Sequence, residues 1–427
     1  MLKEALEFGK TKKQELLNIF WLLIDKGIRL LVGVIIGVYV ARYLGPSDYG
    51  TLNLVKTFYF TLIPLTTMGL QQIVVKEILS KPKDQFNIIG SSIVLSLMGS
   101  FSAFLLLNLI GAIFSDGDKI FRIMLFVASF SYLAKPIQVI SFVYEARLES
   151  KKNVISLSLG VLVSSLFKAY LVLTGAKLVD FVYSFLLDSI ICLILLCLFA
   201  FKDRLFVQIS YSLKQIGWLL IKSWPLMIAG FSVIFYMQID KIMLGYLMTS
   251  QDVGIYSAAT QLSEVFYFLP VILTTTFFPS MTEKFNNSIS SFEKYFKVLN
   301  KYYVLFALII IAIMLIFSRK IVLAVFGIEY FLAAEVLSVH IIALIFVAMG
   351  VLGSRWILLH EAQKFIMYKS LIGAFVNILL NLILIPRLGI IGCAYATVIS
   401  QFTSAVFLNL LNPKLRKLFF LQLNLMR

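Results

Sequence analysis

The apolar residues of this chain occur in long runs, and this feature restricts its fold more than any other. From Leu16 onward, one run follows another almost to the C-terminus. A helix needs about 20 mostly apolar residues to cross the hydrocarbon core of a bilayer. Hydrophobic residues make up 60% of the chain and charged residues 14%, whereas about 25% of the residues of a soluble domain are charged. The sequence therefore predicts an all-α, polytopic membrane protein.

The apolar runs predict twelve transmembrane helices. The first run continues from Leu16 to Val40 and has no cleavage site of small residues, so it is a membrane helix and not a cleavable signal peptide. The predicted spans are 16–41, 51–75, 87–114, 120–145, 153–173, 179–201, 218–247, 253–279, 298–317, 335–360, 364–385 and 391–411.

The distribution of lysine and arginine predicts the orientation of these spans. If the N-terminus is cytoplasmic, 24 of these residues fall in cytoplasmic segments and 7 in outer turns. Cytoplasmic loops retain positive charge, so both termini are predicted to be cytoplasmic. The formal net charge of +16 is spread over all the cytoplasmic turns. It is therefore explained by topology and by contact with anionic membrane lipids, and no nucleic-acid partner is expected.

Short polar turns recur at equivalent places in the two halves of the chain. "YLGPSDYG" (43–50) precedes the second span, and "YLMTSQDVG" (246–254) precedes the eighth. Each is interpreted as a helix start, in which serine and aspartate accept from free N–H groups and glycine makes the turn. "EARLESKKN" (145–153) precedes the fifth span and "EAQKFIMYK" (361–369) the eleventh.

These matches predict two six-helix bundles that form a parallel repeat. The predicted domains are an N-terminal bundle of residues 1–201, a cytoplasmic linker of residues 202–217 and a C-terminal bundle of residues 218–427. The segments 202–215 and 282–297 resemble amphipathic helices that lie on the membrane surface.

Charged residues inside the predicted spans are the candidate functional residues, because such residues are costly in a membrane and usually face a cavity. The cations are candidates for substrate translocation: Lys26, Arg29, Lys56, Lys135, Lys168, Lys241 and Arg355. The acids are candidates for ion coupling: Asp25, Asp188, Asp240 and Glu264. A row of cations through the bilayer suits a substrate with phosphate or other acidic groups. The cysteines and histidines show no metal-ligand spacing, so neither a metal nor a cofactor is expected.

Two stretches resemble a known family. "NIFWLLIDKGIRLLVGVIIGVYVARYLGPSDYGTLNLVKTFYFTLIPLTTMGLQQIVVKEI" (18–78) is similar to the start of bacterial polysaccharide flippases of the Wzx type. "NILLNLILIPRLGIIGCAYATVIS" (377–400) is similar to their last two helices. These flippases belong to the multidrug/oligosaccharidyl-lipid/polysaccharide exporter superfamily.

The resemblance implies a function. Such a flippase translocates an undecaprenyl-pyrophosphate-linked oligosaccharide, a repeat unit of O-antigen or lipopolysaccharide, from the inner to the outer leaflet by alternating access through a cationic cavity. It implies the bacterial plasma (inner) membrane as the location. Its expected partners are the lipid-linked substrate and, beside it, a polysaccharide polymerase and chain-length proteins.

The sequence also bears on three other function classes. A non-catalytic scaffold would not need charges in the bilayer. A MATE-like, cation-coupled multidrug antiporter of the same superfamily would need acid-dominated cavities, and H⁺ or Na⁺ would be the coupling ion. A membrane enzyme would need a large loop or a catalytic cluster at the membrane surface, and the short loops contain neither, so the chain is not expected to be an enzyme.

The predicted topology can be tested with reporter fusions. Reporters that are active only in the cytoplasm should be inactive when fused after residue 48 or residue 250, and active when fused after residue 204 or at the C-terminus. Cytoplasmic activity at residue 48 or residue 250 would contradict the predicted orientation.

Overall fold

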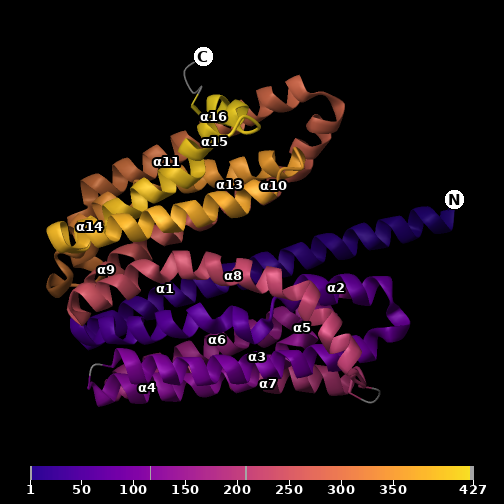
Figure 1. The fold of residues 1–427 in the computed structure, drawn as a ribbon, viewed down its shortest axis with the longest axis horizontal. Helices are drawn as coiled ribbons and strands as arrows, with labels where there is room; N and C mark the ends of the chain where they lie inside the picture. The colour runs from indigo at the N-terminus through magenta and orange to yellow at the C-terminus, as the bar shows by residue number, and fades with distance from the viewer. Residues whose placement is uncertain (1, 116, 207–208, 424–427) are drawn as a thin grey trace. The chain divides into compact units, whose positions relative to one another are not determined.

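The structure, a computed structural model, describes residues 2–115, 117–206 and 209–423. The side chains of residues 2–20 and 22–25 lie outside this description. Helices account for nearly all the described residues, and no strand occurs among them (Figure 1). The predicted all-α class is therefore confirmed.

The described chain divides into two compact units. Unit 1 consists of residues 1–43 and 55–234, and unit 2 of residues 44–54 and 235–427. Two helices contribute to both units: α1 (Leu2–Thr67) and α8 (Leu213–Leu247). The short segment 44–54 thus belongs to unit 2 by its contacts, although the chain on both sides of it belongs to unit 1.

Unit 1 is built around the packing of α2, α3, α5 and α7. The remaining elements of unit 1 are α2 (Leu70–Ser80), η1 (Pro82–Asp84), α3 (Gln85–Phe114), α4 (Lys119–Ser129), η2 (Phe130–Gln138), α5 (Val139–Ala146), α6 (Ser150–Leu173), η3 (Leu178–Val182) and α7 (Tyr183–Lys202). One apolar cluster of unit 1 contains Leu70, Ile88, Val143 and Leu196, all buried. The 3₁₀ segment η2 contains Pro136, which removes a helical hydrogen bond.

Unit 2 contains the remaining helices. They are α9 (Ser250–Glu264), η4 (Val265–Tyr267), α10 (Phe268–Asn287), α11 (Ile289–Val325), η5 (Ile328–Tyr330), α12 (Ala333–His340), α13 (Ala343–Leu359), α14 (Lys364–Phe402), the π-helical η6 (Thr403–Phe407), α15 (Leu408–Leu411) and α16 (Arg416–Leu423). The short α16 inserts Leu418 and Leu421 among Phe292, Phe296 and Trp356, so the end of the chain completes the core of this unit.

Among the described residues, ten helices are long and apolar enough to cross a membrane. The two longest, Lys26–Ser80 with 55 residues and Lys364–Leu411 with 48, each exceed what one crossing needs. Each also contains one glycine with non-helical φ and ψ, Gly45 and Gly389. These glycines lie between spans that the sequence separates, so each long helix can supply two crossings. The count of twelve stays a prediction.

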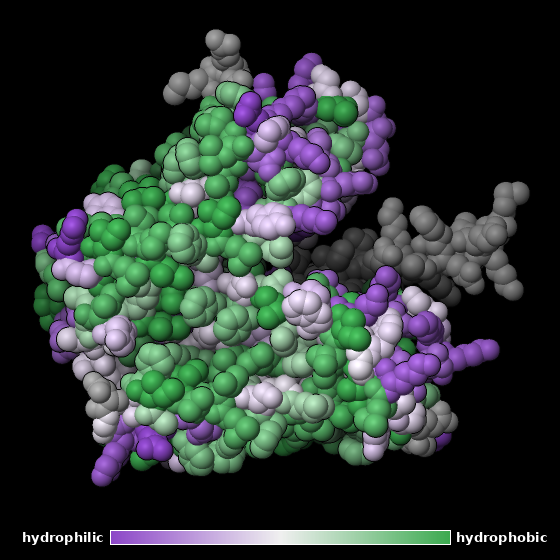
Figure 2. Space-filling model, viewed as in Figure 1, coloured by the Kyte–Doolittle hydropathy of each residue, from purple (hydrophilic) through white to green (hydrophobic). Residues whose placement is uncertain are grey.

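Apolar side chains cover much of the flanks of the helices, as a lipid-facing surface requires (Figure 2). Hydrophilic side chains gather at helix ends, for example where α10 turns into α11. The prediction of a surface helix over 282–297 is wrong, because these residues extend α10 and α11 on either side of Ser288, which caps α11. Residues 203–206 and 209–212 are not helical either. These segments mix polar and apolar residues because helices end there and the chain leaves the apolar core.

The recurring turn before the second and eighth spans has a clear geometric role inside unit 2. A Cβ atom on Gly50 would overlap the carbonyl oxygen of Ser250, and one on Gly254 would overlap that of Pro46. The two contacts are equivalent, since each glycine meets the residue four positions before the other glycine. The prediction that glycine makes the turn is confirmed in the first motif, where Gly45 has a positive φ, and wrong in the second, where Gly254 lies within α9. Gly50 and Gly254 lie within helices and permit their close crossing.

The turns themselves use other residues. In the first half, Gly45 has a φ of 69°. In the second, Thr249 and Asp252 form a capping box at the start of α9, with Asp252 Oδ2 accepting from the Thr249 N–H at 3.1 Å.

The turns that precede α6 and α14 share one geometry, which also occurs at the ends of α6 and α7. The N–H of Glu149 donates to the carbonyl oxygen of Tyr144 at 2.8 Å, and the N–H of Ala362 donates to that of Ile357 at 3.0 Å. In each turn the preceding residue has a positive φ, 57° at Leu148 and 55° at Glu361. Both are helix ends of the Schellman type. The structural register pairs Leu148 with Glu361, and it is therefore shifted from the letter-by-letter match of the two motifs.

The glycine crossing predicts a specific loss of stability. Gly254→Ala should destabilise the protein by about 1–3 kcal/mol, because the new methyl group meets backbone that cannot turn away. Gly217→Ala is the matched control, since a Cβ there has no heavy atom within 4 Å. Thermal unfolding of both variants in lipid nanodiscs measures the difference. Equal midpoints for the two variants would contradict the crossing.

Candidate functional site

A polar pocket lies inside unit 2, where α8, α9, α12 and α14 meet. Two of the acids predicted from the sequence, Asp240 and Glu264, line it together with the predicted cation Lys241. The complete lining is Tyr236, Met237, Asp240, Lys241, Tyr256, Glu264, Tyr267, His340, Asn377, Thr397 and Gln401.

Asp240 is the most extensively hydrogen-bonded side chain of this pocket. Its side chain is buried, and Oδ1 accepts from Asn381 Nδ2 at 2.7 Å. Oδ2 accepts from Thr397 Oγ1 at 2.6 Å and from the hydroxyl of Tyr256 at 3.0 Å. Hydrogen bonds to a carboxylate are short and strong, so these donors fix its position between α8, α9 and α14.

A network on α14 extends from Asp240. Asn381 also donates to Asn377 Oδ1 at 3.0 Å, and Asn377 Nδ2 donates to Ser400 Oγ at 3.4 Å. Ser400 lies 3.3 Å from the hydroxyl of Tyr236. The chain of contacts returns to α8 one turn before Asp240, and it therefore couples the acid to the packing of α8 on α14.

The second part of the pocket surrounds His340, at the end of α12. Its Nδ1 lies 2.7 Å from Ser263 Oγ. The imidazole stacks on Tyr267, with ring centroids 6.3 Å apart, and meets the edge of Tyr256 at 6.1 Å. Glu264, Asp240 and Lys241 all act on it electrostatically. Two acids, a lysine and a histidine thus share one enclosed site.

A group of cations lies in unit 1, in which Lys135 is buried and Lys168 and Arg29 are half-buried. Asp188 on α7 interacts electrostatically with Lys135 on η2 and with Lys168 on α6. Its carboxylate is so close to α6 that a Cβ on Gly160 would lie 2.8 Å from Oδ1. Arg29 on α1 lies near this group, because both it and Asp188 act on Cys192. Two lysines therefore share Asp188, and the balance among these three residues is positive.

Aromatic rings position these cations. The ring of Tyr59 stacks on Tyr132 at 4.9 Å and on Phe185 at 5.4 Å. The side chain of Lys135 is hydrogen-bonded to Tyr59, and the ammonium of Lys168 lies 5.8 Å from the centroid of Phe185. A cation over an aromatic face is stabilised by the ring quadrupole.

The structure places the remaining predicted residues elsewhere. Lys26 and Lys56 are exposed on α1, and the ammonium of Lys56 lies 5.9 Å from the ring of Phe60. Arg355 is on α13 in unit 2, with its guanidinium 5.0 Å from the ring of Phe278. The side chain of Asp25 lies outside the described residues.

Sequence reasoning missed most of the unit 2 pocket. It treated His340 as isolated, because no other histidine or cysteine is near it in the chain. It also passed over Asn377, Asn381 and Thr397, although two asparagines four residues apart on an apolar helix are a usable signal, since both lie on one face. Within the described part of the chain, no three His, Cys, Asp or Glu side chains form a group that could hold a metal ion.

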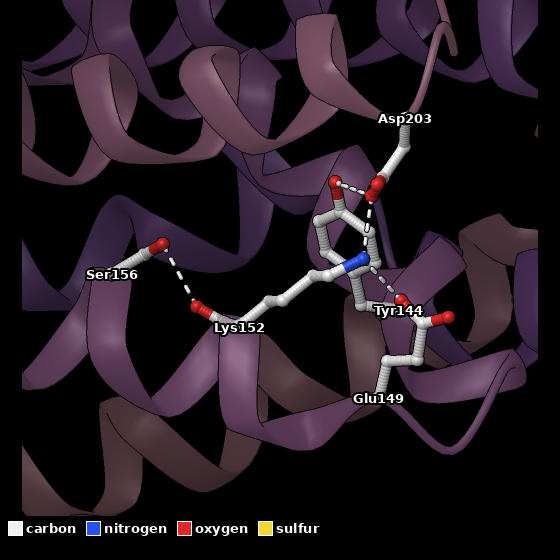
Figure 3. A network of polar contacts seen from close by, with 5 residues as sticks. All are labelled: Tyr144, Glu149, Lys152, Ser156 and Asp203. Carbon is white, nitrogen blue, oxygen red and sulfur yellow. Dashed lines mark hydrogen bonds and ion pairs between the residues drawn. The ribbon is translucent and has the colours of Figure 1, made fainter.

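A third polar cluster connects the ends of α6 and α7 (Figure 3). Lys152 Nζ lies 2.6 Å from both Asp203 Oδ2 and Glu149 Oε2, and the Tyr144 hydroxyl donates to Asp203 Oδ2 at 2.9 Å. Burial by itself raises the pKa of the Asp203 carboxyl, but the hydrogen bonds from Lys152 and Tyr144 outweigh it and hold that pKa below its usual value. The cluster connects α6, which carries Lys168, to α7, which carries Asp188.

The sequence of the chain is similar to those of known proteins. The sequence profile of the family described as "Polysaccharide biosynthesis protein" matches residues 16–285. A curated relative from Haloferax volcanii, described as "Probable low-salt glycan biosynthesis flippase Agl15", is 27% identical over 169 residues. That match covers 39% of this chain and 35% of the relative, so the chain aligns with about a third of that relative's length.

Solved structures show a similar fold. The inward-facing form of a multidrug resistance MATE family transporter of the MOP superfamily has a TM-score of 0.76 at 14% identity, over 94% of this chain and 98% of that one. The lipid II flippase MurJ in an inward closed conformation has a TM-score of 0.75 at 16% identity, over 96% and 91%. A MOP superfamily transporter from Pyrococcus furiosus has a TM-score of 0.66 at 13% identity, over 94% and 95%.

The Asp203 cluster predicts a pH-dependent stability. A carboxyl with a lowered pKa stabilises the fold above the unfolded value of about 3.9, and this contribution is lost as the pH falls through the folded pKa. Asp203→Asn should therefore lower stability by about 1 kcal/mol at pH 7, and the difference from the wild type should shrink below about pH 4. Thermal unfolding across pH measures this, with the exposed Asp84→Asn as control. A constant difference at all pH values would contradict the assignment.

Proposed function

The chain belongs to the polysaccharide biosynthesis protein family, and we propose that it translocates an undecaprenyl-pyrophosphate-linked oligosaccharide from the inner to the outer leaflet by alternating access. The chain is a multi-pass membrane protein. We place it in the bacterial plasma membrane with both termini cytoplasmic, beside a polymerase and chain-length proteins that use the delivered repeat unit.

The cations of unit 1 carry this proposal. Lys135 and Lys168 share the single charge of Asp188, so these three residues have spare positive charge in an apolar bundle. A pyrophosphate cannot leave water for such a bundle without counter-charges, because an unpaired buried charge costs several kcal/mol. We propose that these two lysines, together with Arg29, hold the pyrophosphate during transport. We assign Asp188 to the positioning of Lys135 and Lys168 rather than to ion coupling.

The acids of unit 2 are the proposed coupling residues. Asp240 and Glu264 lie in one enclosed pocket with a single lysine, so this pocket favours the binding of a cation. We propose that the binding of H⁺ or Na⁺ here drives the cycle, while Lys241 offsets part of the acidic charge. Arg355, Lys26 and Lys56 then serve the approach of the substrate at helix ends and not its passage.

The acidic pocket also favours a second candidate, a cation-coupled multidrug antiporter. An antiporter would bind a lipophilic cation, and the cationic group of unit 1 would repel it. The two candidates therefore predict opposite effects of removing positive charge in unit 1. A flippase loses transport of its anionic substrate, whereas an antiporter keeps or gains transport of a cationic one.

Substitution of the unit 1 cations tests the proposal. Lys135→Ala or Arg29→Ala should lower surface polysaccharide at least about tenfold at equal protein abundance, since about 1.4 kcal/mol corresponds to a factor of ten. Arg29→Lys should retain part of the activity, because it keeps the charge and loses only the guanidinium fork. Polysaccharide display is measured by antibody binding to cells and normalised to the amount of membrane-inserted protein.

Lys177→Ala is the matched control, since Lys177 is an exposed residue of unit 1 beside the helices of these cations. Normal display in both Lys135→Ala and Arg29→Ala would contradict the flippase. Ethidium resistance that rises in these variants, together with normal display, would favour the antiporter.

A further inference from the structure

His340 has features that the proposed function does not yet use. It is one of two histidines in the chain, its side chain is only 3% exposed, and it lies in the same pocket as Asp240 and Glu264. A histidine changes its charge near neutral pH, where carboxylates and lysines in water do not. Two acids beside it favour its charged form, so the pocket contains a titratable group besides its carboxylates and its lysine.

Ser263 holds the imidazole of His340 in place. The hydroxyl of Ser263 lies 2.7 Å from His340 Nδ1 and 3.0 Å from the carbonyl oxygen of Thr260. An imidazolium carries a hydrogen on both ring nitrogens, so in the charged ring Nδ1 donates to the Ser263 oxygen. Protonation of His340 therefore keeps the bond to Ser263.

Asp240 is less suited to receive that proton. Its Oδ1 faces the amide of Asn381, and its Oδ2 faces the hydroxyls of Thr397 and Tyr256. An ionised carboxylate accepts from all three donors, whereas a protonated one carries its own hydrogen toward one of them. Protonation of Asp240 would therefore give up or reverse one of these three hydrogen bonds.

The charges of the side chains in the pocket add up to zero when one proton is bound. With a neutral imidazole, Asp240 and Glu264 leave one negative charge that Lys241 does not offset. With an imidazolium, the pocket is neutral. Because an uncompensated charge is costly in an apolar bundle, binding of one proton at His340 completes the balance.

We propose that His340 binds the coupling proton and that Glu264 holds the resulting imidazolium. The coupling role rests on the proposed flippase function, but the proton site does not. Three elements place titratable side chains around His340. These are α8 with Asp240 and Lys241, α9 with Tyr256 and Glu264, and η4 with Tyr267. The neighbouring α11 packs apolar residues against Ile341, and α14 contributes Asn377 and Thr397.

Direct titration tests the proton site. In His360→Gln protein labelled with ¹⁵N-histidine and held in nanodiscs, all imidazole signal comes from His340, since the chain has two histidines. Ring nitrogen shifts between about pH 5 and 9 should show one titration. Glu264→Gln should move the midpoint to lower pH by about one unit or more, because it removes the negative charge that favours the imidazolium.

Glu293→Gln is the control for loss of a carboxylate, since Glu293 pairs with Lys417 outside the pocket, at 2.5 Å. It should leave the midpoint unchanged. Absence of titration over this range, or a midpoint that ignores Glu264→Gln, would overturn the proposal.

Transport under a pH gradient tests coupling. The probe is a fluorescent undecaprenyl-pyrophosphate-linked N-acetylglucosamine in proteoliposomes, with flipping read by dithionite quenching. An imposed gradient should accelerate wild type and His360→Gln, while His340→Gln should flip without responding to the gradient. A full gradient response in His340→Gln would overturn the coupling role and leave the flippase standing. No flipping of the probe by the wild type would count against the proposed function, and the titration would still decide the proton site.

Discussion

Charge compensation inside an apolar helix bundle is the requirement on which both polar sites depend. An ionised group there needs either a counter-charge or hydrogen-bond donors, because the lipid and the apolar helices supply neither. Unit 1 meets this requirement with counter-charges, since Asp188 is shared by Lys135 and Lys168. Unit 2 meets it with donors, since Asp240 accepts from Asn381, Thr397 and Tyr256. The two solutions leave spare positive charge in one unit and spare negative charge in the other.

Under the proposed function, this difference separates two tasks, which are binding of the anionic substrate and binding of the coupling cation. A group of cations with too few acids suits an anionic head group, and a pocket with too few cations suits a small cation. If both tasks used one site, each ligand would have to displace the other from the same counter-charges. With separate sites, binding in one unit can influence the other only through the packing of helices, which is the usual basis of coupled transport.

Close backbone approach supports the same architecture. Gly50 and Gly254 let two helices cross so tightly that a methyl group on either meets the other's backbone. The segment that carries Gly50 consequently belongs to unit 2, although its neighbours in the chain belong to unit 1. Such a crossing is stable only where both helices supply a residue without a side chain. The motif was visible in the sequence as a repeated turn, but the role of Gly254 was misassigned, because a glycine beside Ser and Asp reads most simply as a turn residue.

The sequence by itself determined the class of fold and the family, because runs of about 20 apolar residues have few stable solutions other than membrane helices. It also identified candidate functional residues by their charge, since Asp240, Glu264, Lys135 and Lys168 all lie in apolar runs. Only the tertiary structure decided how they are grouped. The pocket joins Asp240 to Asn381, 141 residues away in the chain, and Glu264 to His340 on another helix. Helix periodicity gives the face on which a residue lies but not the face it meets, so contacts between helices distant in sequence had to come from their packing.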